Sequence, residues 1–184
     1  MTDQIYMKRC IELAKKALGK TYPNPLVGSV IVYQDTIIGE GYHHKAGENH
    51  AEINAINSVK NKDLLKESTI YVSLEPCAHY GRTGPCANKI VEIGFRKVVI
   101  GTLDSHEKVN GKGKEILENA GIEVVSGILE KECQELNKRF FTFHQQKRPY
   151  IILKWAQSND GFLDKDFKPT SISNSLSKQF VHTL

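Results

Sequence analysis

Apolar positions recur along the chain with two different periods, and the alternation between these periods predicts an α/β protein. Apolar residues spaced three and four apart indicate helices, whereas short continuous or alternating apolar runs indicate strands. The helices predicted in this way cover residues 3–18, 51–61, 85–93, 113–120 and 129–146. The predicted strands cover residues 26–33, 36–42, 69–74, 96–102 and 122–126, and the first two form a hairpin. A hairpin followed by alternating strands and helices favours a mixed sheet covered by helices on both faces.

The pattern changes at Arg148-Pro149, where a proline ends the last of these helices. Residues 150–155 are predicted to form one more strand, and in the polar remainder only residues 175–184 show a weak helical pattern. Such a short segment cannot build a second hydrophobic core. We therefore predict a main domain at residues 1–147 and a short second part at residues 148–184.

Composition and charge exclude several classes of protein. Hydrophobic residues make up 40% and charged residues 25% of the 184 residues, as in ordinary globular proteins. The formal net charge of +4 is scattered rather than gathered in blocks, so a nucleic-acid groove is not implied, and an anionic small molecule would suit this balance. Neither a signal peptide nor an apolar run long enough to cross a bilayer is present, which predicts a cytoplasmic protein without a membrane partner.

The candidate chemistry lies in His50-Ala51-Glu52, Pro76-Cys77 and Cys86. One imidazole and two thiolates favour Zn²⁺ and leave a fourth position open for water or substrate. His50 lies at the start of one predicted helix, and Cys77 and Cys86 lie at the start of the next. At a helix start, side chains can converge beyond the helix end, and the free N–H groups favour thiolates. Glu52 can then act as a base beside the metal without binding it, which is the pattern of zinc-dependent nucleobase deaminases.

Two other interpretations of the cysteines were weighed. A closed zinc site that only stabilises the fold would need a fourth protein ligand, and His43, His44 or His79 could supply it. Such a site would not depend on Glu52. Cys10 and Cys133 lie in predicted helices without a partner ligand nearby, so we expect both to be buried core thiols.

The spacing between the two cysteines is the most specific feature. Cytidine and transfer-RNA adenosine deaminases hold theirs as Cys-x-x-Cys, whereas eight residues separate Cys77 from Cys86 here and form a loop that can line a substrate pocket. A family resemblance rests on several stretches together, namely residues 24–28, 41–43, 50–52, 75–86, Asp104 and 110–113. In these stretches the chain resembles the bifunctional riboflavin-biosynthesis deaminase–reductase family.

This resemblance implies a cytidine-deaminase-like α/β/α sandwich of three layers with a mixed sheet. It implies hydrolytic deamination of 2,5-diamino-6-ribosylamino-4(3H)-pyrimidinone 5′-phosphate to 5-amino-6-(5-phosphoribosylamino)uracil. Carried over residue by residue, it makes His50, Cys77 and Cys86 the ligands of one zinc ion and Glu52 the catalytic proton shuttle. The residues that it places in the substrate pocket are Asn24, His43, His79, Arg82, Asp104 and Asn110. Gly84 and the residue after Asp104 stand where the family usually has proline, and neither departure removes a functional group.

Two of these positions also have a structural interpretation. Arg82 is either a clamp for the substrate phosphate or a solvated loop charge. Asn110, with the glycines that follow it, either helps to hold a phosphate at a helix N-terminus or simply caps a helix start.

The segment 148–161 is similar to the opening of the family's reductase domain. The similarity implies NADPH contacts at Lys154, Ser158 and Asp160, but a complete reductase domain would be needed to form that site. The chain is then either a fragment of a longer bifunctional protein or a short deaminase with a vestigial tail. We predict no reductase activity for it, and NADPH-dependent reduction by the purified chain would contradict this.

Two rival functions remain beside this deaminase. One is deamination of another purine or pyrimidine base or nucleotide, and the other is a non-catalytic, zinc-stabilised module that binds ribotides. The partners expected in every case are a small phosphorylated substrate and water, without nucleic acid, and a homo-oligomer is compatible with the sequence.

Overall fold

The computed structural model describes residues 2–80, 84–106, 109–168 and 170–182. These residues divide into two compact units, Met1–Tyr150 and Ile151–Leu184, and each is described by itself. Among the described residues, no helix is both long and apolar enough to cross a membrane.

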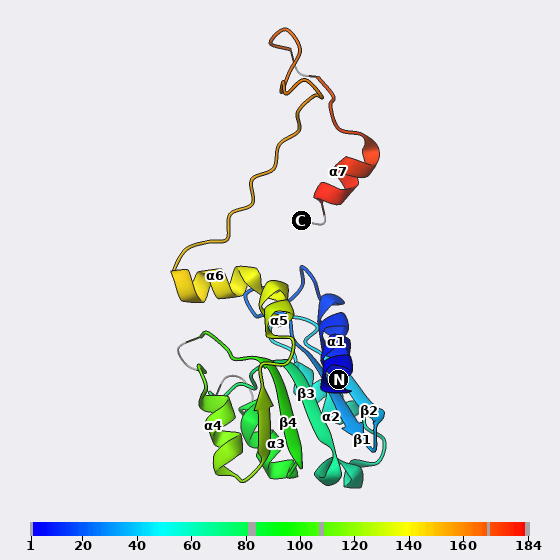
Figure 1. Ribbon diagram of the computed structural model, residues 1–184, viewed down its shortest axis with the longest axis vertical. Coiled ribbons are helices and arrows are strands. Elements are labelled where there is room, and N and C mark those ends of the chain that lie inside the picture. Colours follow the sequence, from blue (N-terminus) through cyan, green and yellow to red (C-terminus); the bar gives the residue numbers. More distant parts are fainter. Residues whose placement is uncertain (1, 81–83, 107–108, 169, 183–184) are drawn as a thin grey trace. The chain divides into compact units, whose positions relative to one another are not determined.

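The first unit is built on a five-stranded sheet within its described residues, in the order β2-β1-β3-β4-β5 (Figure 1). The strands are β1 (Gly28–Tyr33), β2 (Thr36–Tyr42), β3 (Thr69–Leu74), β4 (Lys97–Thr102) and β5 (Glu123–Ser126). Strand β1 runs antiparallel to both β2 and β3, whereas β3, β4 and β5 are parallel to one another. The β1–β2 hairpin turns at Gln34 and Asp35, whose φ angles of 47° and 59° suit the twist of a two-residue hairpin.

Helices cover both faces of this sheet. The helices are α1 (Thr2–Lys15), α2 (Ala51–Ser58), α3 (Cys86–Ile93), α4 (Lys112–Asn119), α5 (Glu130–Leu136) and α6 (Lys138–Gln146), with a short 3₁₀ helix at Lys62–Glu67. Because successive side chains of a strand point to opposite faces, Val30 and Tyr71 pack with α1 and α5, whereas Ile31 and Val72 pack with α2, α3 and α4. The predicted three-layer sandwich with a mixed sheet is confirmed.

The predicted helix over residues 129–146 is wrong in one respect, because it is broken at Asn137 into α5 and α6. The side chain of Asn137 accepts a hydrogen bond from the N–H of Leu26 (2.7 Å) and donates one to its carbonyl oxygen (2.8 Å). Asn137 is buried, and its backbone leaves helical geometry (φ −113°, ψ 26°). The buried backbone groups of Leu26 need partners, and the helix breaks where Asn137 supplies them.

In the second unit the predicted strand at residues 150–155 is wrong, because residues 150–157 form neither a strand nor a helix. A strand takes its hydrogen bonds from a neighbour, and the described part of Ile151–Leu184 offers only an isolated bridge between Lys165 and Lys168. The weak helical pattern near the end corresponds to α7 (Ser175–Val181), which Asn174 caps by accepting from the N–H of Ser177 (2.8 Å).

Candidate metal and catalytic site

The potential metal ligands lie where strands give way to helices. His50 is the residue before α2, in an extended conformation, and its side chain does not cap the helix. Cys77 follows β3 after Glu75 and Pro76, and Cys86 is the first residue of α3, with Pro85 at the cap position. Proline is well suited to a helix start because its fixed φ matches the first turn and its missing N–H is not needed there.

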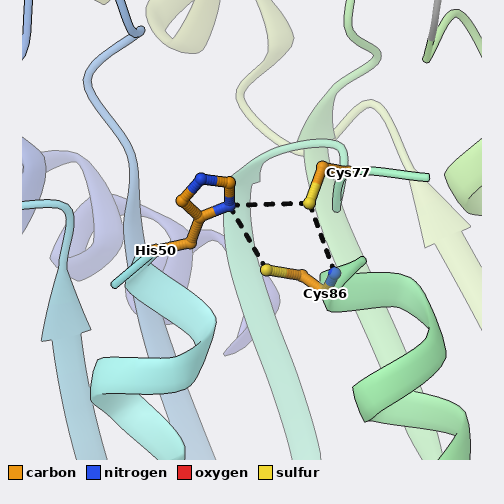
Figure 2. Close-up of side chains that lie close together, drawn as sticks. All are labelled: His50, Cys77 and Cys86. Atoms are coloured by element: carbon orange, nitrogen blue, oxygen red, sulfur yellow. Dashed lines mark hydrogen bonds between the residues drawn. The ribbon is translucent and has the colours of Figure 1, made fainter. Parts of the chain in front are cut away.

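These three side chains converge (Figure 2). The Nδ1 atom of His50 lies 3.5 Å from Sγ of Cys77 and 3.4 Å from Sγ of Cys86. A tetrahedral ion with bonds of about 2.3 Å to sulfur and about 2.0 Å to nitrogen would hold those atoms about 3.5 Å apart. The spacing therefore fits a small tetrahedral ion, and in the described residues the group that could hold a metal contains these three residues alone.

The electrostatics of the group favour a thiolate at Cys77. A hydrogen bond from Cys86 and contact with His50 hold the pKa of Cys77 well below its usual range. The neighbouring Cys77 raises the pKa of Cys86, as does burial, whereas the hydrogen bond to Cys77 raises the pKa of His50 to about 9. The backbone N–H of Cys86 also donates to the sulfur of Cys77 (3.2 Å). Two thiols and an imidazole that share protons in this way would lose those protons to the solvent when a divalent cation binds.

Glu52 lies in the first turn of α2, two residues after His50, and only 3% of it is exposed. Burial raises the pKa of its carboxyl group to about 7, and the charge of Cys77 adds to the increase. A carboxyl group that titrates near neutral pH beside a metal-binding group has the properties of a general acid–base catalyst.

His43 and Asn24 form a pair beside this group. The Nε2 atom of His43 lies 3.0 Å from Nδ2 of Asn24, and its Nδ1 atom lies 3.0 Å from the carbonyl oxygen of Asn49. The ring of His43 meets that of His50 edge to face, with 5.4 Å between centroids. Burial lowers the pKa of His43, which favours the neutral form of its ring. Both of its nitrogens have partners, which argues against His43 as a fourth metal ligand.

The predicted pocket residue Asp104 follows β4 and is 8% exposed. Its Oδ1 atom accepts a hydrogen bond from the N–H of His106 (2.7 Å), and burial raises its pKa to about 6. The ring of His79, which follows Cys77 by two residues, stacks on that of His106 with 6.2 Å between centroids. The loop that begins at Asp104 is thus brought to the turn that carries Cys77.

Asn110 is exposed and has a φ of 32°, whereas Gly111 is the residue that caps α4. The alternative that Asn110 caps this helix is therefore wrong. At the start of α4, the N–H groups of Gly111 (3.0 Å) and Lys114 (3.1 Å) donate hydrogen bonds to the carboxylate of Glu75. An acidic side chain is favourable at that end of a helix, and it leaves less room there for a phosphate.

Arg82 lies outside the described residues. Lys154, Ser158 and Asp160 belong to the second unit, where Ser158 is half-buried and the other two are exposed. The hydroxyl group of Ser158 donates to the carboxylate of Asp160 (2.5 Å), and its N–H donates to the carbonyl oxygen of Phe162 (2.8 Å). These bonds close a turn within the unit.

Glu75 contacts Asp104, Asn137 holds the backbone of Leu26 two residues after Asn24, and neither was predicted as functional. Glu75 directly precedes Pro76-Cys77, so its position in the motif is a signal that sequence reasoning could have used. No sequence pattern marks Asn137, whose partner Leu26 is 111 residues away.

Comparisons with known proteins agree with this geometry. Residues 1–102 match the family model described as the cytidine and deoxycytidylate deaminase zinc-binding region. The riboflavin biosynthesis protein RibD of Aquifex aeolicus is 52% identical over 161 residues, which cover 88% of this chain and 45% of that protein. The diaminohydroxyphosphoribosylamino-pyrimidine deaminase of Buchnera aphidicola is 50% identical over 141 residues, which cover 77% of this chain and 95% of that protein.

Among solved structures, RibD of Acinetobacter baumannii matches with a TM-score of 0.92 and 44% identity, over 99% of this chain and 51% of that one. The chain thus spans about half the length of the RibD proteins that it matches.

Proposed function

Because the chain belongs to the RibD family of riboflavin-biosynthesis proteins with a cytidine-deaminase-type zinc-binding region, we propose that it is a zinc-dependent hydrolytic deaminase. Its substrate is 2,5-diamino-6-ribosylamino-4(3H)-pyrimidinone 5′-phosphate, and its products are 5-amino-6-(5-phosphoribosylamino)uracil and ammonia. The observation that carries the proposal is the tetrahedral spacing of His50, Cys77 and Cys86 with the buried carboxyl group of Glu52 next to them.

His50, Cys77 and Cys86 would hold one Zn²⁺ per chain. Zn²⁺ held by these residues supplies Lewis acidity, which makes water a better nucleophile at neutral pH. Two thiolates cancel the charge of the ion and weaken that effect, so a base beside the ion is needed, and Glu52 is the base.

Glu52 transfers two protons in turn during the reaction. Its carboxylate takes a proton from the attacking water and gives it to the ring nitrogen beside the 2-amino carbon, which makes that carbon more electrophilic. The carbon–oxygen bond forms, Glu52 takes the remaining proton from the new hydroxyl group and delivers it to the amine, and the carbon–nitrogen bond breaks to leave a carbonyl group and ammonia. One water is consumed, one ammonia leaves, and the 2-amino group is replaced by oxygen. Burial raises the pKa of Glu52, which suits a group that must both accept and donate a proton near neutral pH.

The remaining predicted pocket residues would orient the substrate. The carbonyl oxygen of Asn49 assigns the proton of His43 to Nδ1, so Nε2 accepts from the amide nitrogen of Asn24. Asn24 then presents its amide oxygen to a donor on the substrate. Asp104 lies at the start of a loop against the Cys77 turn, and we assign it, with His79, Arg82 and Asn110, to the substrate on the basis of the family resemblance.

A role for Lys154, Ser158 and Asp160 in binding NADPH stays a prediction that rests on the family resemblance. A homo-oligomer and a main domain at residues 1–147 stay predictions.

Ammonia release with a choice of substrates tests the proposal. With the zinc-loaded chain, we expect kcat/KM for the diaminopyrimidinone ribotide to exceed that for dCMP, cytidine or guanine by at least about a hundredfold, because unpaired polar groups penalise the wrong ring. Faster release from one of the other three would identify the rival deaminase. Zinc bound without release from any of them would favour the non-catalytic module.

A further inference from the structure

Glu75 is a buried carboxylate that the proposed mechanism does not use. It is 4% exposed, and its own N–H donates to the carbonyl oxygen of Thr102 at the end of β4 (3.0 Å). Its Oε2 atom accepts from the N–H groups of Asp104 (3.1 Å) and Gly111 (3.0 Å), and its Oε1 atom accepts from the N–H of Lys114 (3.1 Å). Hydrogen bonds from N–H groups to a buried charge are strong ones, and they offset the cost of burying it.

Two of these bonds come from the two ends of one loop. Asp104 and Gly111 are the two ends of the loop 104–111, and both donate to the same oxygen atom of Glu75. The carboxylate thus holds Asp104 and Gly111 close to each other. The loop carries Asp104 and Asn110, two of the residues that we assign to the substrate.

The same contact reaches the metal-binding turn through the backbone. A Cβ atom at Gly113 would lie 2.0 Å from the carbonyl oxygen of Pro76 and 3.2 Å from Oε1 of Glu75. The start of α4 therefore packs backbone to backbone against the residue before Cys77. No side chain lies between them to absorb a displacement, so the start of α4 and Pro76-Cys77 are held in one fixed arrangement.

We propose that Glu75 is a positioning residue that fixes Asp104 and the start of α4 relative to Pro76-Cys77 and thereby sets the affinity for the ribotide. The proposal rests on the deaminase function above for the identity of the ligand. Glu75 takes no part in the chemical steps, since its two oxygens are directed to backbone N–H groups. It acts through Asp104 and the start of α4.

The variant Glu75→Gln tests this with little change in volume. A glutamine side chain has one acceptor oxygen and places an NH₂ group against at least one of the three N–H donors. We expect KM, and the Kd for the product ribotide measured by calorimetry, to rise about tenfold or more, the loss typical of a hydrogen bond to a charged group. We expect kcat and one zinc per chain to be retained, because the loop binds substrate and Glu52 performs the proton transfers. The matched control is Glu115→Gln, an exposed carboxylate on α4, which should change neither constant.

A second readout does not depend on activity. Amide hydrogen exchange at Asp104, Gly111 and Lys114 should be faster in Glu75→Gln than in the parent chain, while exchange in β1 and β3 stays the same. Gly113→Ala disturbs the same contact from the other side and should reproduce both the weaker ribotide binding and the faster exchange.

Three results would overturn the role given to Glu75. They are unchanged exchange at the three amides, unchanged affinity despite faster exchange, or a lower kcat with loss of zinc, which would place Glu75 in support of the metal instead. If the parent chain binds the product ribotide but releases no ammonia from the substrate, the deaminase function fails, and the comparison of affinities still decides the role of Glu75.

Discussion

Replacing Glu52 with glutamine is expected to lower kcat for ammonia release by about 10²–10⁴-fold, the contribution typical of a general acid–base group. Glutamine fills nearly the same volume but can neither take the proton from water nor return it to the departing amine. The buried position of Glu52 lets the neutral amide pack in its place, so we expect zinc content to be unchanged. Single-turnover ammonia release, with zinc measured on the same sample, checks both expectations.

Glu48→Gln is the control for this experiment. It changes an exposed carboxylate in the loop just before α2 and should leave kcat as it is. A Glu52→Gln protein that holds one zinc and turns over at the parent rate would remove Glu52 from the mechanism and favour a structural zinc site.

The second large effect is expected when a ligand is removed. Cys77→Ser replaces a thiolate with a hydroxyl group, which is a much poorer ligand for Zn²⁺ at neutral pH. In the parent chain, free zinc at about a thousand times its Kd should stabilise the folded state by about 4 kcal/mol. We therefore expect a chelator to lower the melting temperature of the parent clearly and to have little effect on Cys77→Ser. Calorimetric melting with and without the chelator, together with metal analysis, is the measurement.

Cys10→Ala provides the comparison for a thiol that holds no metal. Cys10 is fully buried between α1 and the sheet, so its loss weakens packing, yet this variant should keep both its zinc and its response to the chelator. Retention of a full equivalent of zinc by Cys77→Ser would contradict the proposed ligand set.

Local pattern was sufficient for much of the fold. Strand β3 has the predicted bounds, and the hairpin, the parallel strands and the two helix layers follow from alternation and helical spacing. The spacing of His50, Cys77 and Cys86 also predicted that three distant residues would meet, because helix starts at one edge of a sheet bring their first residues together. The family resemblance is confirmed by relatives of about 50% identity.

Tertiary contacts explain the failures. The break at Asn137 serves the backbone of Leu26, which lies far away in the sequence, so helical periodicity alone extended the helix too far. The N–H groups at the start of α4 are satisfied by Glu75, which directly follows β3, and nothing near Asn110 in the sequence indicates this. The apolar run at residues 150–155 has strand character but finds no neighbouring strand in the described part of its unit. In each case the sequence pattern favoured the predicted structure locally, and the presence or absence of a hydrogen-bond partner far away in the sequence determined the structure that forms.

The central claim is that this chain replaces a ring amino group with oxygen from water. Its most direct test is the reaction of the zinc-loaded chain with the diaminopyrimidinone ribotide in water enriched with oxygen-18, followed by mass spectrometry of the product. We predict one labelled oxygen in the uracil ring for each ammonia released. Ammonia without label in the ring, or no conversion by a chain that carries its zinc, would contradict hydrolytic deamination at this site.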